Sequence, residues 1–259
     1  GDSACCLPPF SLSDEIISTI ERQTKVLAQS LQVQGLMNIQ FAVEDNKVFV
    51  LEVNPRASRT IPFVSKAIGM PLAKIASKIM MGVNLNEQNV TTNKTSQYFA
   101  VKEAVFPFSK FYGVDTILGP EMKSTGEVMG VGKTFGEAFI KSQLGAGIIF
   151  PEEISGKLAF LSVRNTDKPQ AVNIAKKLKK LGFNLVATRG TAKFIAENGI
   201  SVEIVNKVAE GRPHVVDMIK SGQISFILNT VEERKSAIRD SRSIRTSALS
   251  EAVTTYTTI

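Results

Sequence analysis

This sequence has only two cysteines and one histidine, and it lacks long apolar runs. No apolar run reaches the roughly 18 residues that a membrane-spanning helix needs, so no membrane partner is expected. The two cysteines, Cys5 and Cys6, are neighbours, which disfavours a disulfide framework and fits a reducing cytoplasm. A catalytic thiol is the alternative, but the only histidine, His214, lies far away in sequence. His214 stands at an expected helix start, where we predict a solvent-facing or capping role.

The length and charge of the chain indicate two globular domains of different character. The chain has 259 residues, and its hydrophobic share of 43% is normal for a protein with a buried core. Residues 1–150 hold 14 basic and 13 acidic side chains, whereas residues 151–259 hold 17 and 11. This excess suggests an anionic partner, either nucleic acid or a phosphorylated small molecule. Nucleic acid is disfavoured, because no aromatic residues alternate with the basic ones and "KKLKK" (176–180) is typical of a solvated helix face.

The segment "PEEISGK" predicts a boundary, because it mixes Pro, Ser, Gly and charge between apolar regions. We expect a first domain at 1–150, a linker at 151–156 and a second domain at 157–259. The start, "GDSACCLPPF", has neither an initiator Met nor a signal peptide pattern, so we expect a chain that begins inside a domain.

The second domain alternates short apolar runs with helical segments, which predicts an α/β fold with a mostly parallel sheet and helices on both faces. The expected strands are 158–163, 183–187, 202–205 and 224–230, and the expected helices are 167–182, 192–199 and 214–222, with "TRGT" (188–191) as a loop. The first domain is less regular. Its expected elements are a helix at about 13–33, a hairpin of strands 37–44 and 47–53, a helix at about 60–81, a strand at 97–106 and a glycine-rich segment at 118–139 that becomes helical.

The hairpin carries polar residues where a buried strand would carry apolar ones. Glu52 and Asn54 are two apart and share a face, and Gln40 on the partner strand can join them. One carboxylate and two amides suit a hard cation such as Mg²⁺, which commonly also binds nucleotide phosphates. Arg56 and Arg59 follow at once and could bind phosphate or carboxylate oxygens. From spacing alone, a solvated strand face explains these residues equally well.

A second set of polar residues stands at the expected carboxyl ends of the parallel strands, where open α/β sheets bind ligands. These residues are Lys168, Thr188, Gly190, Thr191, Lys207, Asn229 and Thr230. The turn "ATRGT" offers hydroxyls and backbone N–H groups at a helix start, which suits phosphate. Helix capping alone is an alternative for Thr188 or Thr191.

Several motifs point to a known family. The stretch "NIQFAV…VFVLEVNPRASRTIPFVSKAIGMPLAKIASKIMMG" resembles the late part of an ATP-grasp domain, and with "GPEMKSTGEVMGVG" it is similar to the carbamoyl phosphate synthetase large-subunit family. Residues 157–259 resemble the family's regulatory domain, which has a methylglyoxal-synthase-like fold. The resemblance covers the whole chain in the family's order and implies the end of the second ATP-grasp domain followed by the regulatory domain. Methylglyoxal synthase itself, the catalytic alternative, needs a histidine and acidic residues at its phosphate site.

The resemblance implies a cytoplasmic ligase for arginine and pyrimidine biosynthesis that phosphorylates carbamate with ATP. It implies that Gln40, Glu52 and Asn54 bind ATP through Mg²⁺ or Mn²⁺, with K⁺ also possible, and that Arg56 and Arg59 contact carbamate or the transferred phosphoryl group. Most of the ATP cleft would lie upstream, so we expect this chain alone to be inactive. The partners it implies are a glutaminase small subunit, a nucleoside monophosphate effector such as UMP or IMP, and further small/large heterodimers.

Departures from the family pattern concern regulation. Val231 stands where some relatives carry a hydroxyl, and the tail "EAVTTYTTI" lacks the Tyr-Asp pair of ornithine-responsive relatives. Asp2 and Glu103 match positions near the ornithine site, although Glu103 could equally be an exposed charge at a strand edge. The alternative to the enzyme is a stand-alone regulatory module that binds nucleotides without catalysis.

Overall fold

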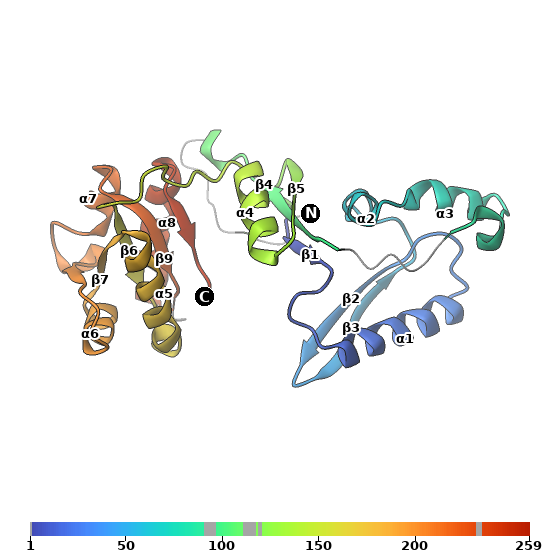
Figure 1. Cartoon of the computed structure of the whole chain (residues 1–259), viewed down its shortest axis with the longest axis horizontal. Helices are drawn as coiled ribbons and strands as arrows, with labels where there is room; N and C mark the ends of the chain where they lie inside the picture. Colours follow the sequence, from blue (N-terminus) through green and yellow to red (C-terminus); the bar gives the residue numbers. More distant parts are fainter. Residues whose placement is uncertain (1, 91–96, 111–117, 119–120, 232–234) are drawn as a thin grey trace. The chain divides into compact units, whose positions relative to one another are not determined.

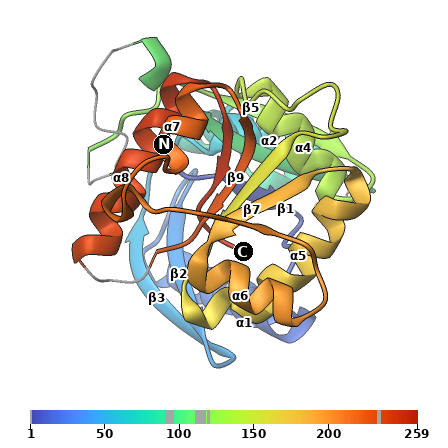
Figure 2. The ribbon, with the colours of Figure 1, turned by 90° about the vertical axis from the view of Figure 1, so that its left-hand side faces the viewer.

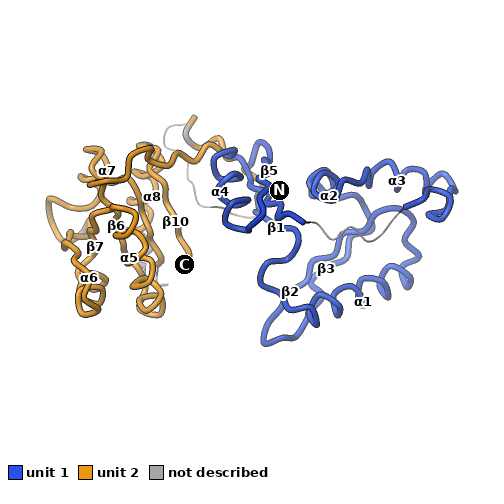
Figure 3. The backbone as a smooth tube through the Cα atoms, in the orientation of Figure 1, with its two compact units in different colours: residues 1–105, 124–146 blue, residues 106–123, 147–259 orange. Residues whose placement is uncertain are grey.

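The computed structural model describes residues 2–90, 97–110, 118, 121–231 and 235–259. The chain divides into two compact units, which are coloured separately in Figure 3. Unit 1 consists of residues 1–105 and 124–146, and unit 2 of residues 106–123 and 147–259. In the described residues, no helix combines the length and apolar character that crossing a membrane requires.

Unit 1 contains the expected hairpin and the helix that precedes it (Figure 1). Strands β2 (Asn38–Glu44) and β3 (Lys47–Asn54) pair antiparallel, and helix α1 (Asp14–Ser30) contacts β3. Asp45 and Asn46 join the strands with φ of 47° and 60°, as in the two-residue turns that match strand twist. Helix α1 begins at Ser13, whose hydroxyl accepts a hydrogen bond from the N–H of Ile16.

The single helix expected at about 60–81 is wrong, because the structure has two helices there. Helix α2 (Ile61–Ile68) ends at Gly69, which adopts the left-handed conformation with φ of 66°. Pro71 follows and precedes helix α3 (Leu72–Met80), and a short 3₁₀ turn, η1 (Leu85–Gln88), comes next. A left-handed glycine followed by proline is a strong helix stop, and the apolar periodicity on both sides concealed it.

A second sheet in unit 1 has the strand order β1-β4-β5 and is antiparallel throughout. Its strands are β1 (Cys5–Leu7), β4 (Phe99–Val105) and β5 (Gly126–Gly132), and β1 was not predicted. Cys5 and Cys6 are free in this structure.

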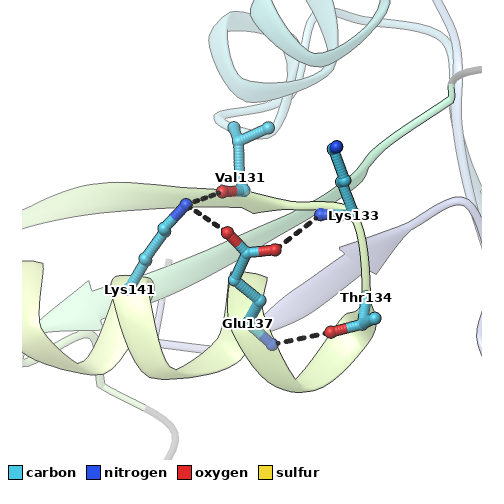
Figure 4. Close-up of polar contacts among 5 residues, drawn as sticks. All are labelled: Val131, Lys133, Thr134, Glu137 and Lys141. Atoms are coloured by element: carbon cyan, nitrogen blue, oxygen red, sulfur yellow. Dashed lines mark hydrogen bonds and ion pairs between the residues drawn. The ribbon is translucent and has the colours of Figure 1, made fainter.

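Helix α4 (Phe135–Gly145) packs closely on β5 and is held at its first turn by side chains. Thr134 accepts from the N–H of Glu137, and the Glu137 carboxylate accepts from the N–H of Lys133 and from Lys141 Nζ (Figure 4). The side chains of Thr134 and Glu137 therefore accept hydrogen bonds from backbone N–H groups at the start of α4.

Unit 2 is built on a five-stranded parallel sheet of order β10-β9-β6-β7-β8. Figure 2 labels two of its strands, β7 and β9. The strands are β6 (Leu158–Ser162), β7 (Asn184–Thr188), β8 (Glu203–Val205), β9 (Ile224–Asn229) and β10 (Thr254–Tyr256). Helices α5 (Lys168–Leu181) and α6 (Arg189–Glu197) share one apolar core with the sheet, and α7 (Val215–Lys220) and α8 (Lys235–Ser250) share the other. Short 3₁₀ turns η2 (Phe108–Lys110), η3 (Asn165–Asp167) and η4 (Val208–Glu210) complete the unit. The predicted parallel sheet covered on both faces is confirmed.

Unit 2 departs from expectation at three places. Helix α6 begins at Arg189 with Thr188 as its N-cap residue, so "TRGT" is not a loop. Neither α8 nor β10 was predicted, because the α8 sequence is rich in Ser and Arg and three-residue β10 is defined by its pairing with β9. His214 is 7% exposed, so the solvent-facing position is wrong. Its capping role is confirmed, because Nδ1 accepts from the N–H of Asp217.

Candidate functional site

Four polar side chains lie on one face of the β2–β3 hairpin, at its open end. Gln40 pairs with Glu52 across the ladder, and Asn38 pairs with Asn54. Paired residues and residues two apart on a strand share a face, so all four side chains point to the same side. The structure therefore brings together the predicted Gln40, Glu52 and Asn54 and adds Asn38, which sequence reasoning missed although it stands two residues before Gln40.

A β-bulge determines which face carries Glu52. Phe41 pairs with Val50, whereas the adjacent Gln40 pairs with Glu52, so Leu51 is an extra residue on β3. Regular alternation would place Val50 and Glu52 on one face, but the extra residue turns Glu52 to the other. Val50 and Glu52, although two residues apart on β3, therefore point to opposite faces of the hairpin. This explains how a valine-rich strand also presents a carboxylate.

The chemistry of the polar face suits a hard cation that also binds phosphate. Glu52 supplies its one carboxylate, and Asn54 Nδ2 donates to Glu52 Oε1 over 2.9 Å. The amide nitrogen of Asn54 is thereby directed to Glu52, and its carbonyl oxygen is left to accept. In the described ranges, no three His, Cys, Asp or Glu side chains gather as a metal site. A Mg²⁺ ion on this face would complete its coordination with water or phosphate oxygens, as is common for this ion.

Arg56 and Arg59 lie between β3 and α2, and both are exposed. The N–H of Arg56 donates to the Asn54 carbonyl over 2.8 Å, which turns the chain sharply after the polar strand. Arg56 Nη1 donates to the Ala57 carbonyl at 3.3 Å. One such bond engages only part of a guanidinium group that has five N–H donors, so Arg56 keeps donors for an anion.

A cavity of about 230 Å³ lies in unit 2 at the carboxyl ends of β6, β7 and β9. All seven residues predicted for the anion site line it, which is where the structure places Lys168, Thr188, Gly190, Thr191, Lys207, Asn229 and Thr230. Val231, singled out as a departure from the family pattern, also lines it. Sequence reasoning did not assign the other lining residues to the site, namely Ser162, Val163, Arg164, Asn165, Ser241 and Ile244. The position of Arg164 directly after an expected strand could have indicated it. Ser241 and Ile244 come from α8, for which the sequence had no signal.

Buried hydroxyl groups form the floor of the cavity and tie the strand ends together. Thr191 Oγ1 accepts from the N–H of Val163 at 3.2 Å, and Thr188 Oγ1 lies 3.3 Å from Ser162 Oγ and 3.4 Å from Thr191 Oγ1. Thr188 and Thr191 are only 3% and 2% exposed. The Thr188 proton serves Ser162 or Thr191, so Thr191 is the threonine of this pair whose own proton can reach a ligand.

The far wall of the cavity is held in the same way. Asn229 Nδ2 donates to Ser241 Oγ over 2.9 Å, which links β9 to α8. Both side chains are buried, at 3% and 4% exposed. The amide nitrogen of Asn229 is therefore occupied within the protein, and its carbonyl oxygen is the part that can accept from a ligand.

Lys168 and Lys207 give the cavity its positive charge. Among the described residues, neither ammonium group forms an ion pair, although the backbone N–H of Lys207 donates to the Glu210 carboxylate. Lys168 Nζ lies 3.7 Å from where a Cβ on Gly190 would stand, next to the start of α6. Two unpaired cations, buried hydroxyls and a helix start converge on one cavity, which is chemistry suited to a phosphate group.

Two further residues singled out from the sequence lie in unit 1. Asp2 Oδ1 accepts from the N–H of Ser124 at 2.9 Å. Glu103 accepts from Gln143 Nε2 at 2.7 Å, and its strand β4 is the central strand of its sheet. The alternative reading of Glu103 as a charge at a strand edge is therefore wrong. Burial raises the pKa of the Glu103 carboxyl above its usual value, despite hydrogen bonds from the Ala104 backbone and Gln143.

Both regions of the chain are similar to parts of one kind of known protein. Residues 1–88 match the model of the carbamoyl-phosphate synthase L chain, ATP binding domain, and residues 170–257 match that of the MGS-like domain. Carbamoyl phosphate synthase large chains from Ralstonia nicotianae, Neisseria meningitidis serogroup A and Pasteurella multocida are 56%, 57% and 56% identical. Each alignment covers 100% of this chain and 24% of the relative, so the chain spans about a quarter of the length of these proteins.

Proposed function

Because this chain is similar along its whole length to the C-terminal part of carbamoyl phosphate synthase large chains, we propose that it serves such an enzyme in two ways. Unit 1 supplies metal-binding and charge-stabilising residues for the ATP-dependent phosphorylation of carbamate to carbamoyl phosphate. Unit 2 binds a regulatory nucleotide. Glutamine, bicarbonate and a glutaminase small subunit belong to the complete enzyme in this proposal, as does a cytoplasmic location.

The polar face of the hairpin is the observation that supports the first role. Glu52, with amide oxygens from Gln40 and Asn54, would hold a Mg²⁺ or Mn²⁺ ion. The ion supplies charge neutralisation when it is bound. Arg56 and Arg59 donate hydrogen bonds to carbamate or to the transferred phosphoryl group, since positioning and electrostatic stabilisation dominate this kind of reaction.

The test of the first role is ATP formation from ADP and carbamoyl phosphate by the complete enzyme. Glu52→Gln keeps the size of the side chain and a hydrogen bond to Asn54, but removes the only carboxylate of the polar face. We expect this variant to lose most of the activity and to keep its melting temperature. Near-normal turnover at ordinary Mg²⁺ concentration would contradict the assignment.

The cavity of unit 2 supports the second role. A nucleoside monophosphate such as UMP or IMP would place its phosphate between Lys168 and Lys207, over the Thr188–Thr191 turn. Val231 lines the cavity but cannot donate a hydrogen bond, so we expect weaker binding than in relatives with a hydroxyl there. Lys207→Ala should weaken UMP binding by about tenfold or more, because a charged hydrogen bond contributes about 1.5–3 kcal/mol.

The same cavity favours a second candidate function, a nucleotide-binding regulatory module without catalysis. Isothermal titration and the ATP-forming assay distinguish the two. UMP or IMP binding by a complete protein that forms no ATP from ADP and carbamoyl phosphate would favour the module. Loss of activity in Glu52→Gln, together with nucleotide binding, supports the enzyme.

A further inference from the structure

Arg164 is a third cation at the cavity of unit 2, and its backbone is hydrogen-bonded to a residue that lines the cavity. Its N–H donates to Thr230 Oγ1 over 3.0 Å. Arg164 Nε donates to Asp167 Oδ2 over 2.8 Å, and the Arg164 side chain is 52% exposed. This ion pair uses one of five guanidinium N–H donors, which leaves both terminal amino groups of Arg164 available to a ligand.

Asp167 is held by the protein on several sides. The Thr230 hydroxyl and Arg164 both hydrogen-bond to its carboxylate, whose side chain is 13% exposed. Partial burial acts to raise the pKa of the Asp167 carboxyl, but the hydrogen bonds from Thr230 and Arg164 outweigh it and lower that pKa. Asp167 is therefore ionised at neutral pH. Since the Thr230 proton is directed to Asp167, Thr230 shapes the cavity floor but has no donor left for a ligand.

The charges around the cavity favour an anion such as a phosphate monoester. Among the described residues, the cations Arg164, Lys168 and Lys207 line it. Asp167 pairs with Arg164, and the Glu210 carboxylate accepts from the backbone N–H of Lys207. Three cations against two carboxylates leave a positive excess, which a phosphate monoester, with about −1.5 to −2 charges at neutral pH, would neutralise.

We propose that Arg164 is a further anion-binding residue of this cavity, with Asp167 as its positioning residue. Asp167 holds Nε, and the two terminal amino groups of Arg164 donate side by side to the phosphate oxygens of the effector. This inference rests on the regulatory role proposed for unit 2. It adds Arg164 to the lysines and threonines already proposed to bind the phosphate.

Titration of UMP against the complete enzyme tests the inference, because two variants of the ion pair should change affinity differently. Arg164→Gln removes the donors and one positive charge, so affinity should fall about tenfold or more. Asp167→Asn keeps an oxygen that accepts from Arg164 Nε and removes the negative charge, so affinity should stay equal or rise. Arg164→Lys keeps the charge without the paired donors, and its affinity should lie between wild type and Arg164→Gln.

Lys193→Gln is the matched control. Lys193 lies on α6, is 78% exposed, pairs with Glu197 at 3.9 Å and does not line the cavity, so its loss should leave UMP affinity unchanged. Melting temperatures of all variants verify folding. If Arg164→Gln binds UMP like wild type, or if Arg164→Gln and Asp167→Asn lose affinity equally, the inference is overturned while the regulatory role stands. If wild type binds neither UMP nor IMP at millimolar concentration, both fail.

Discussion

Gln40 lies directly opposite Glu52 in the β2–β3 ladder, immediately beside the bulge at Leu51. This pairing places an amide and a carboxylate on the same face of the hairpin. It also brings Asn38 and Asn54 to that face, because they form the next pair of the ladder with side chains on the same side. The hairpin therefore presents four polar groups in two adjacent rows.

The positions of these four residues predict that their substitutions reduce the phosphorylation of carbamate to different extents. Glu52→Gln should reduce activity most, because Glu52 is the one carboxylate among the four polar residues. Asn38→Ala should act more mildly and raise the Mg²⁺ concentration needed for half-maximal activity by roughly tenfold, as expected for a group at the edge of a metal site. Initial rates of the complete enzyme across a Mg²⁺ titration measure both effects.

Glu44→Gln is the control for the hairpin, because Glu44 is an exposed carboxylate at the other end of β2. Its rate and Mg²⁺ dependence should equal those of wild type. An equal loss in Glu44→Gln and Glu52→Gln would mean that general surface charge, and not the polar face, governs activity.

Gly130 predicts a large and local effect on stability. A Cβ at Gly130 would stand 2.1 Å from the Ala138 carbonyl oxygen and 2.4 Å from the Ser142 nitrogen, both backbone atoms of α4. The helix would have to move off β5, so Gly130→Ala should destabilise unit 1 by about 1–3 kcal/mol or more. Gly136→Ala, on the same helix, meets nothing within 4 Å and should stabilise by about 0.4–1 kcal/mol. Urea unfolding of the purified chain compares the two, and similar midpoints would contradict the close packing.

The ion pair of Lys102 and Glu127 predicts an asymmetry between its two halves. Lys102 Nζ lies 3.0 Å from Glu127 Oε1, and the side chains are 3% and 25% exposed. Glu127→Gln would remove the ion-pair partner of a buried ammonium group, which should cost about 3–5 kcal/mol of unfolding free energy. Lys102→Met should cost less, because the remaining Glu127 carboxylate reaches water. Urea denaturation at pH 7 tests the order, and an equal or larger loss in Lys102→Met would reverse the argument.

Glu103 predicts a dependence of stability on pH. Burial raises the pKa of its carboxyl above the ordinary 4.5, so the folded protein binds this proton more tightly than the unfolded chain does. The contribution of Glu103 to stability is therefore fully present below the ordinary pKa and is lost as pH rises through the raised one. Glu103→Gln cannot titrate, so its stability relative to wild type should increase as pH rises from about 4 to 7. Unfolding free energies at several pH values measure this, with Glu44→Gln as the parallel control, and a difference that does not vary with pH would contradict it.

Local patterns in the sequence predicted much of the second unit. The strand–helix alternation did not predict which strands pair or their order in the sheet. It did place seven polar residues at the carboxyl ends of strands, and these ends meet at one edge of a parallel sheet. The cavity followed from that placement. The hairpin could also be predicted from the sequence, because its turn residues and the apolar runs beside them lie within a few positions of each other.

The sequence by itself determined which residue types stand at the ends of the strands, and therefore the chemistry that each site offers. Tertiary structure alone decided three other features: the bulge at Leu51 that sorts Glu52 from the valines, the α8 wall with Ser241, and the contact of Arg164 with both Thr230 and Asp167. Strand ends follow from local spacing. A bulge, by contrast, depends on the partner strand, and the docking of α8 depends on apolar side chains far away in the chain, so neither leaves a signal in its own segment.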